Sequence, residues 1–102
     1  MPIKWEFEWY TTDGSNFITI DDWIKTLTSE EQEEYREANA RHKSYRADAI
    51  NSGNFDMVDG SYVWKDGEAE QHAKPNDPIW LEYWDRWQRE TNSTCRLIRT
   101  EI

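Results

Sequence analysis

The chain has 102 residues, which suffices for one modest hydrophobic core, so we expect a single α+β domain over residues 1–102. Its net charge of -9 argues against nucleic acid and anionic membranes as partners, because both need a basic surface. Aromatic residues make up 15% of the chain, which separates it from disordered acidic proteins. A single cysteine excludes an internal disulfide, and there is no apolar run of membrane-spanning length, so we expect a cytoplasmic protein.

The first element is a strand over Ile3–Trp9. Apolar residues alternate with Lys4, Glu6 and Glu8, which is typical of a strand with one buried face. Residues 11–16 have the composition of a loop. Residues 21–24 indicate a short helical turn, capped by Thr19 or Asp21.

A long helix is predicted next, from a capping box at Thr28 and Glu31 to a stop near Ser52 and Gly53. Its acidic residues come first and its basic residues last, an order that complements the helix dipole. The stripe expected to face inward is thin and mixed in polarity: Tyr35, Ala38, His42, Tyr45, Ala49 and Ile50.

Residues 55–64 predict a β-hairpin with a type I′ turn at Asp59 and Gly60. This turn sets Met57 opposite Tyr62 and Phe55 opposite Trp64, which places all four apolar side chains on one face. A second Asp-Gly pair, Asp66 and Gly67, offers a rival hairpin. Residues 68–76 are polar and are predicted to form a loop.

A second helix is predicted over residues 77–90, with Asp77 as its cap and Pro78 at its first position. Trp80, Tyr83, Trp84 and Trp87 fall on one stripe of this helix, and Trp84 is expected at its buried centre. Residues 94–102 predict a final strand, whose facing stays open because Leu97 and Ile98 are adjacent.

This order of strand, helix, strand, strand, helix, strand resembles the ferredoxin-like fold, a four-stranded antiparallel sheet with two helices on one face. More particularly, it resembles the dimeric α/β-barrel superfamily. That resemblance implies two sheets meeting back to back in a homodimer. Some members are small cofactor-free enzymes with a pocket between sheet and helices, and others have no known activity, so the fold does not choose between them.

The residues we expect to line such a pocket are His42, Tyr45 and Trp64. A partly buried histidine can act as a base or orient a ligand, but a packed or half-exposed histidine on a polar helix is the favoured interpretation of His42. The sequence identifies no catalytic residue, since it has no phosphate-binding loop and no Ser-His-Asp or Cys-His arrangement. We expect no cofactor.

Three other groupings have simpler structural interpretations. His72 with Glu68 and Glu70 matches no metal-ligand spacing, so we expect no metal site. Glu6 and Glu8 share one side of a strand and suit either an acid–base pair or a solvated face. The tryptophans suit either an aromatic box or a core, and helical spacing favours a core in which two or three rings line a cavity.

Three functions therefore compete. The first is a small homodimeric α/β-barrel protein that binds a small organic molecule. The second is a non-enzymatic interaction module, and the third is an acidic mimic of nucleic acid. The dimer is expected to form through the sheet face that carries Lys4, Glu6, Glu8, Asp56, Val58, Ser61, Val63 and Lys65, with Arg96 answering Glu6 or Glu8 if it points the same way.

Overall fold

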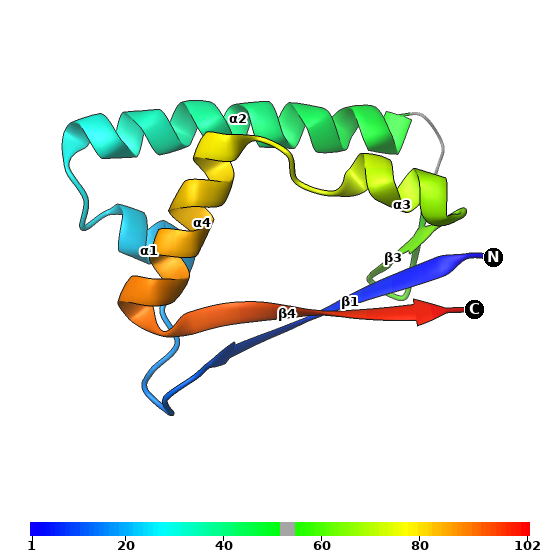
Figure 1. The fold of residues 1–102 in the computed structure, drawn as a ribbon, viewed down its shortest axis with the longest axis horizontal. Helices are drawn as coiled ribbons and strands as arrows, with labels where there is room; N and C mark the ends of the chain where they lie inside the picture. The colour runs from blue at the N-terminus through cyan, green and yellow to red at the C-terminus, as the bar shows by residue number, and fades with distance from the viewer. Residues whose placement is uncertain (52–54) are drawn as a thin grey trace.

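The computed structural model describes residues 1–51 and 55–102 and has an α+β fold with a four-stranded antiparallel sheet. The strands are β1 (Ile3–Thr11), β2 (Phe55–Val58), β3 (Ser61–Trp64) and β4 (Ser93–Glu101), in the spatial order β2-β3-β1-β4. The helices are α1 (Ile20–Ile24), α2 (Ser29–Asn51), α3 (Gly67–Ala73) and α4 (Pro78–Thr91). Figure 1 shows the sheet along one side of the molecule, α3 and α4 next to it, and α2 across the opposite side.

The expected ferredoxin-like arrangement, with two helices lying on one face of the sheet, is not what the structure has. The long helix α2 packs against α4 and α3 (Figure 1). The expected inward stripe of α2 is buried at Tyr35, Ala38 and His42, and it becomes half-buried at Tyr45. Tyr35 and Ala38 belong to the same buried cluster as the aromatic residues of α4. The side chains of Ala49 and Ile50, and the expected helix stop at Ser52 and Gly53, lie outside what the structure describes.

The helix starts follow the sequence signals. Thr28 Oγ1 accepts a hydrogen bond from the Glu31 amide at 3.2 Å, and the Glu31 carboxylate accepts one from the Thr28 amide at 3.3 Å, which confirms the capping box. Thr19 caps α1. Asp77 caps α4 with bonds of 3.1 and 3.0 Å from the amides of Ile79 and Trp80.

The hairpin is confirmed, with Met57 opposite Tyr62 and Phe55 opposite Trp64. Asp59 and Gly60 both have positive φ, 51° and 82°, as a type I′ turn requires. The following loop is the clearest error, because residues 67–73 form α3 and there is no second hairpin at Asp66 and Gly67.

The physical reason lies in Asp66 and in two alanines. Asp66 Oδ1 accepts from the Ala69 amide at 2.9 Å and so caps α3. Ala69 and Ala73, one helical turn apart, are buried against Ile3, Trp5 and Trp64. Two small residues at this spacing are an inconspicuous apolar stripe among polar neighbours.

The ladder between β1 and β4 settles how the last strand faces. Leu97 pairs with Phe7, and Ile98 pairs with Glu6. Leu97 therefore shares the inner face of the sheet, the face turned to the helices, while Ile98 lies on the outer face.

The buried residues form two separate clusters. The helical core joins α1, α2 and α4: Trp23, Ile24, Tyr35, Ala38, Trp80, Tyr83 and Trp87. The sheet core joins β1, β3 and α3: Ile3, Trp5, Trp64, Ala69 and Ala73. The radius of gyration is 15.1 Å, against about 13 Å for a compact chain of this length. The division into two cores accounts for this extended shape.

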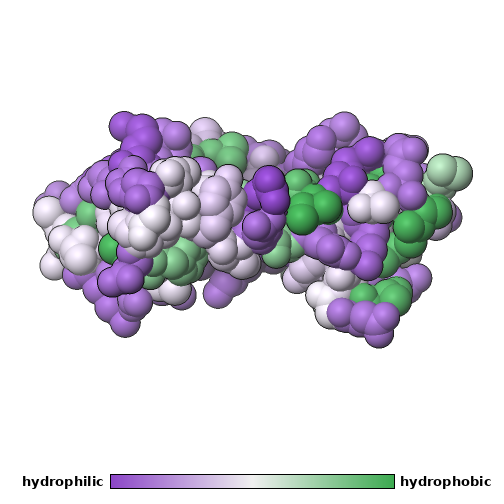
Figure 2. All heavy atoms as spheres, turned by 90° about the horizontal axis from the view of Figure 1, so that it is seen from below, coloured by the Kyte–Doolittle hydropathy of each residue, from purple (hydrophilic) through white to green (hydrophobic). Residues whose placement is uncertain are grey.

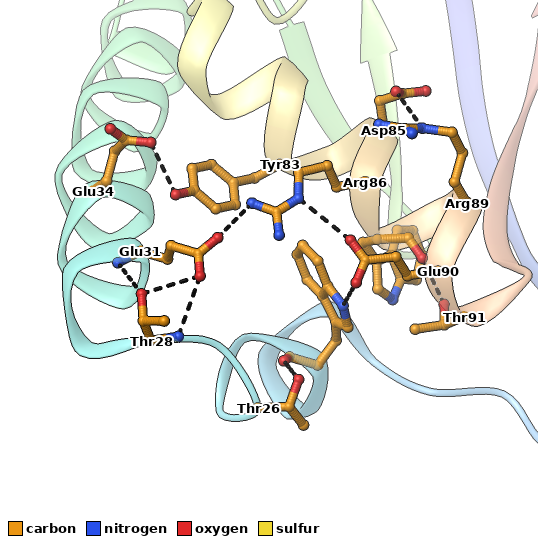
Figure 3. A network of polar contacts seen from close by, with 12 residues as sticks. Thr26, Thr28, Glu31, Glu34, Tyr83, Asp85, Arg86, Arg89, Glu90 and Thr91 are labelled. Atoms are coloured by element: carbon orange, nitrogen blue, oxygen red, sulfur yellow. Dashed lines mark hydrogen bonds and ion pairs between the residues drawn. The ribbon is translucent and has the colours of Figure 1, made fainter.

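A polar network around Arg86 holds α1, α2 and α4 together (Figure 3). Its guanidinium donates to Glu31 of α2 at 2.7 Å and to Glu90 of α4 at 3.3 Å. It also lies over the rings of Trp23 and Tyr83, 5.5 and 5.4 Å from their centroids. Arg86 thus fixes the distance between the two longest helices.

Candidate functional site

Four rings form a continuous run from α2 to β1, which we call the aromatic ladder. His42 lies flat on Trp80, with ring centroids 4.0 Å apart and planes 16° apart. Trp80 stacks on Trp84 at 5.1 Å and 20°. Trp84 meets Trp9 at 6.0 Å in an edge-to-face contact. The ladder therefore connects the helical core to the inner face of the sheet.

The β1 end of the ladder is open to solvent. Trp9 is 54% exposed and Phe7, two residues earlier on the same face, is 43% exposed. Phe7 packs edge-on against Tyr62 at 6.4 Å, which continues the apolar surface towards the sheet core. Figure 1 shows β1 passing below both α3 and α4. Aromatic surface left exposed between two cores is the main candidate site for an apolar ligand.

His42 gives the other end of the ladder a polar group. The residue is buried, and its Nδ1 has no hydrogen-bond partner among the described residues. Burial lowers the pKa of His42, and the nearby charge of Arg46 lowers it further, while Asp77 acts in the opposite direction. The imidazole is therefore neutral at pH 7, and its stacking on Trp80 is a contact between two uncharged rings.

The structure places the three expected pocket residues in different surroundings. His42 stacks on the helical core, and Trp64 is buried in the sheet core. Tyr45 is half-buried on α2, one turn after His42. The indole Nε1 of Trp64 also lacks a partner among the described residues. Two of the three residues thus carry a buried polar nitrogen that is unpaired within the described chain.

A separate pocket of about 420 Å³ opens between α1 and α2, on the helical core and not between sheet and helices. Burial and the charge of Asp21 raise the pKa of Tyr35, which lines it, to about 12. None of the three expected residues lines this pocket. Its lining is mixed in charge: Asp21, Ile24, Lys25, Gln32, Tyr35, Arg36 and Asn39.

The other groupings from the sequence are dispersed. Glu70 points into the sheet core while His72 is exposed, and the described residues hold no group of three potential metal ligands. Glu6 pairs with Lys4 at 2.7 Å, and Glu8 pairs with Arg96. The expected cross-strand partner of Arg96 is therefore Glu8.

Sequence reasoning missed Trp9 and Trp84 as site residues. Trp84 was expected at the centre of the buried stripe, but it is half-buried, and the fully buried ring is Trp87. The length of the first strand could have indicated these residues. A strand of four residues in the hairpin is too short to pair with the whole of β1, so Phe7 and Trp9 lie beyond its end.

Comparisons with protein-family models, with curated proteins and with solved structures gave no match to this chain. Within the described part of the chain, no helix is both long enough and apolar enough to cross a membrane.

Proposed function

We propose that this protein binds a flat, largely apolar organic molecule against the open end of the aromatic ladder. The observation that carries the proposal is the exposure of Trp9 and Phe7 next to Trp84, on the face of the sheet that is turned to the helices. Flat rings exposed side by side offer a ligand both apolar area and a stacking partner. Buried His42 lies at the other end of the ladder and is separated from this surface by Trp80 and Trp84.

The charge of the chain narrows the ligand class. A net charge of -9 repels anions, so a neutral molecule is favoured over a carboxylate or a phosphate ester. Glu6 and Glu8 are each engaged in an ion pair on the outer face.

A neutral fluorescent probe tests this proposal. N-phenyl-1-naphthylamine brightens in apolar surroundings, and we expect saturable brightening with the native chain. Trp9→Ala should weaken binding about tenfold, the effect of losing about 1.4 kcal/mol of stacking and apolar contact. Tyr10→Ala is the matched control, because Tyr10 is the next residue of β1, is also exposed, and lies on the opposite face. Equal loss in both variants, or no saturable binding, would refute the proposal.

The proposal includes the assembly that the dimeric α/β-barrel resemblance implies, in which two sheets meet through their outer faces. Figure 2 views the molecule from the side of β1 and β4 and shows apolar residues interspersed with hydrophilic ones. On the outer face, pairs of opposite charge accompany Val58, Val63 and Ile98. A two-fold axis would set such a mixed face against its own copy, where acids meet bases.

Light scattering across a concentration series tests the assembly. We expect a dimer that dissociates on Val63→Glu, because the new carboxylate would be buried next to Asp56, while the neighbouring Lys4 is already paired with Glu6. Leu97→Glu is the control, since Leu97 is also partly exposed but lies on the inner face. A monomer at all concentrations would exclude this interface.

An interaction module is the second candidate function, and the shape of the molecule favours it. The accessible surface is 6708 Å², whereas about 6100 Å² is typical of a compact monomer of this mass. Exposed large apolar residues occur on both faces, including Met57, Val58, Leu97 and Ile98. Surface of this kind is commonly covered by another protein.

A further inference from the structure

Strand β1 is longer than the strand beside it. β4 pairs with all nine residues of β1, from Ile3 to Thr11. β3 pairs only with Ile3, Lys4 and Trp5. Among the described residues, the segment Phe7–Thr11 therefore has a strand neighbour on one side only, and we call its other side the open edge.

An open edge is a template for a further strand, because alternate backbone groups point outward without a ladder partner. Proteins that keep such edges free usually block them with lysine, proline or a bulge. The segment Phe7–Thr11 contains neither lysine nor proline, and β1 pairs with β4 in unbroken register along its length. The backbone groups of the open edge can therefore pair with an added strand.

We propose that the open edge binds an extended peptide in which apolar and basic residues alternate. A strand added beside Phe7–Thr11 would turn one set of its side chains to the inner face, next to the exposed rings of Phe7 and Trp9. Its other set would lie on the outer face beside Glu8, a half-exposed carboxylate that a basic residue of the peptide would share with Arg96. The charge of -9 attracts such a cationic segment from a distance. Backbone pairing provides the affinity and the alternation provides the register.

The test uses a short acetylated peptide in which lysine and valine alternate, labelled for fluorescence anisotropy. Two control peptides have the same charge: one is scrambled so that alternation is lost, and one is N-methylated at every backbone amide so that neither of its edges can donate to the ladder. We expect both controls to bind at least about tenfold more weakly, which corresponds to about 1.4 kcal/mol of lost pairing. Equal binding of the N-methylated peptide would overturn the proposal.

Variants of the protein locate the peptide. Trp9→Ala should weaken binding, whereas Leu97→Ala should not, because Leu97 lies on β4, on the far side of β1 from the open edge. Amide chemical-shift changes should concentrate in Phe7–Thr11. Changes confined to β4 would show that the peptide binds another strand and would overturn the proposal. A stable dimer that neither binds the peptide nor dissociates in its presence would show that a second copy covers the open edge, and would also overturn it.

This inference does not depend on the small-molecule site. Both proposals use the exposed rings of Phe7 and Trp9, but the peptide also requires the backbone edge of β1, which the small molecule does not use. Binding of naphthylamine with no binding of the alternating peptide would remove the strand-addition proposal alone, and the reverse result would remove the proposed function alone.

Discussion

The helical core and the sheet core both contain large rings, but they satisfy the polar atoms of those rings differently. In the helical core the polar tips reach outward. Tyr83 donates to Glu34 at 2.8 Å, and Trp80 donates to Asn39 at 3.2 Å. In the sheet core the partner is brought inside, because buried Glu70 accepts from the Trp5 indole at 2.8 Å.

A hydrogen-bond partner at the rim of a core and a charged partner inside the core differ in their electrostatic cost. A partner at the rim stays hydrated, so the helical core carries no buried charge. A buried carboxylate must be compensated, and Arg99 does this with a 2.7 Å bond to Glu70 from a half-exposed position. The sheet core should therefore respond to pH and to charge substitutions, and the helical core chiefly to loss of volume.

The largest effect is expected in the helical core, from Trp87→Ala. Trp87 has no exposed surface and donates to the Ile18 carbonyl at 2.8 Å. Removing it should lower the free energy of unfolding by about 3–5 kcal/mol, the usual loss for a large core ring. Urea denaturation measures this. Trp84→Ala is the matched control on the same helix and should cost clearly less, because Trp84 is half-buried; equal losses would mean that the ladder is as much a part of the core as Trp87.

Glu70→Ala tests the buried carboxylate and should destabilise the protein by about 2 kcal/mol, mainly because the Trp5 indole loses its partner. The hydrogen bond from Arg99 lowers the pKa of Glu70. A lowered pKa means that the ionised form stabilises the fold above the ordinary glutamate pKa and that this contribution is lost as the pH falls below it. Glu70→Gln should therefore flatten the decline in melting temperature on acidification to pH 3. An unchanged decline would contradict this role.

Arg86→Ala is expected to cost about 1 kcal/mol, since the guanidinium is part-buried, bonds to Glu31 and Glu90, and covers two rings. Arg89→Ala is the control on the same helix, because Arg89 makes only an exposed pair with Asp85 at 2.8 Å. Its stability should change by less than about 0.5 kcal/mol in the same denaturant melt. If the two variants behave alike, the network around Arg86 does not hold α2 to α4.

The smallest effect is expected at His42 and should be absent at neutral pH. Burial lowers the pKa of this imidazole, so the unfolded chain takes up the proton first. Stability should therefore be intact above the ordinary histidine pKa and decline as the pH falls through it, before the glutamate range is reached. His42→Leu should remove the decline between pH 7 and pH 5 in thermal melts. A decline that persists in this variant would assign the proton uptake to another group.

Most of the local structure was predictable because short-range chemistry determines it. The cap at Asp77, the capping box at Thr28 and the turn at Asp59 and Gly60 each depend on a few neighbouring residues. Helix α3 was not predictable in this way, because its apolar side consists of two alanines. These alanines are buried only because Trp5 and Trp64 pack against them in the folded chain. Hydrophobic periodicity does not detect a stripe that small.

The position of α2 and the candidate site were harder to predict. The predicted order of six elements suggests that both long helices cover the sheet, but α2 packs against α4 and α3. The aromatic ladder follows from that choice, since His42 meets Trp80 only when α2 crosses α4. The burial of His42 could be predicted from its place on the inward stripe, whereas the packing partners of Trp64 depend on the tertiary fold.

The pairing of β1 with β4 has a consequence for how the chain folds. Ile3 pairs with Glu101 and Thr11 pairs with Ser93, so each rung of this ladder joins residues that are more than about 80 positions apart. Such non-local pairing is slow compared with the formation of α2 and α4, whose hydrogen bonds are local. During synthesis the strand with Trp5, Phe7 and Trp9 leaves the ribosome long before its partner exists. The ladder between β1 and β4 therefore closes late, and until it closes the aromatic strand that marks the candidate site is exposed to aggregation.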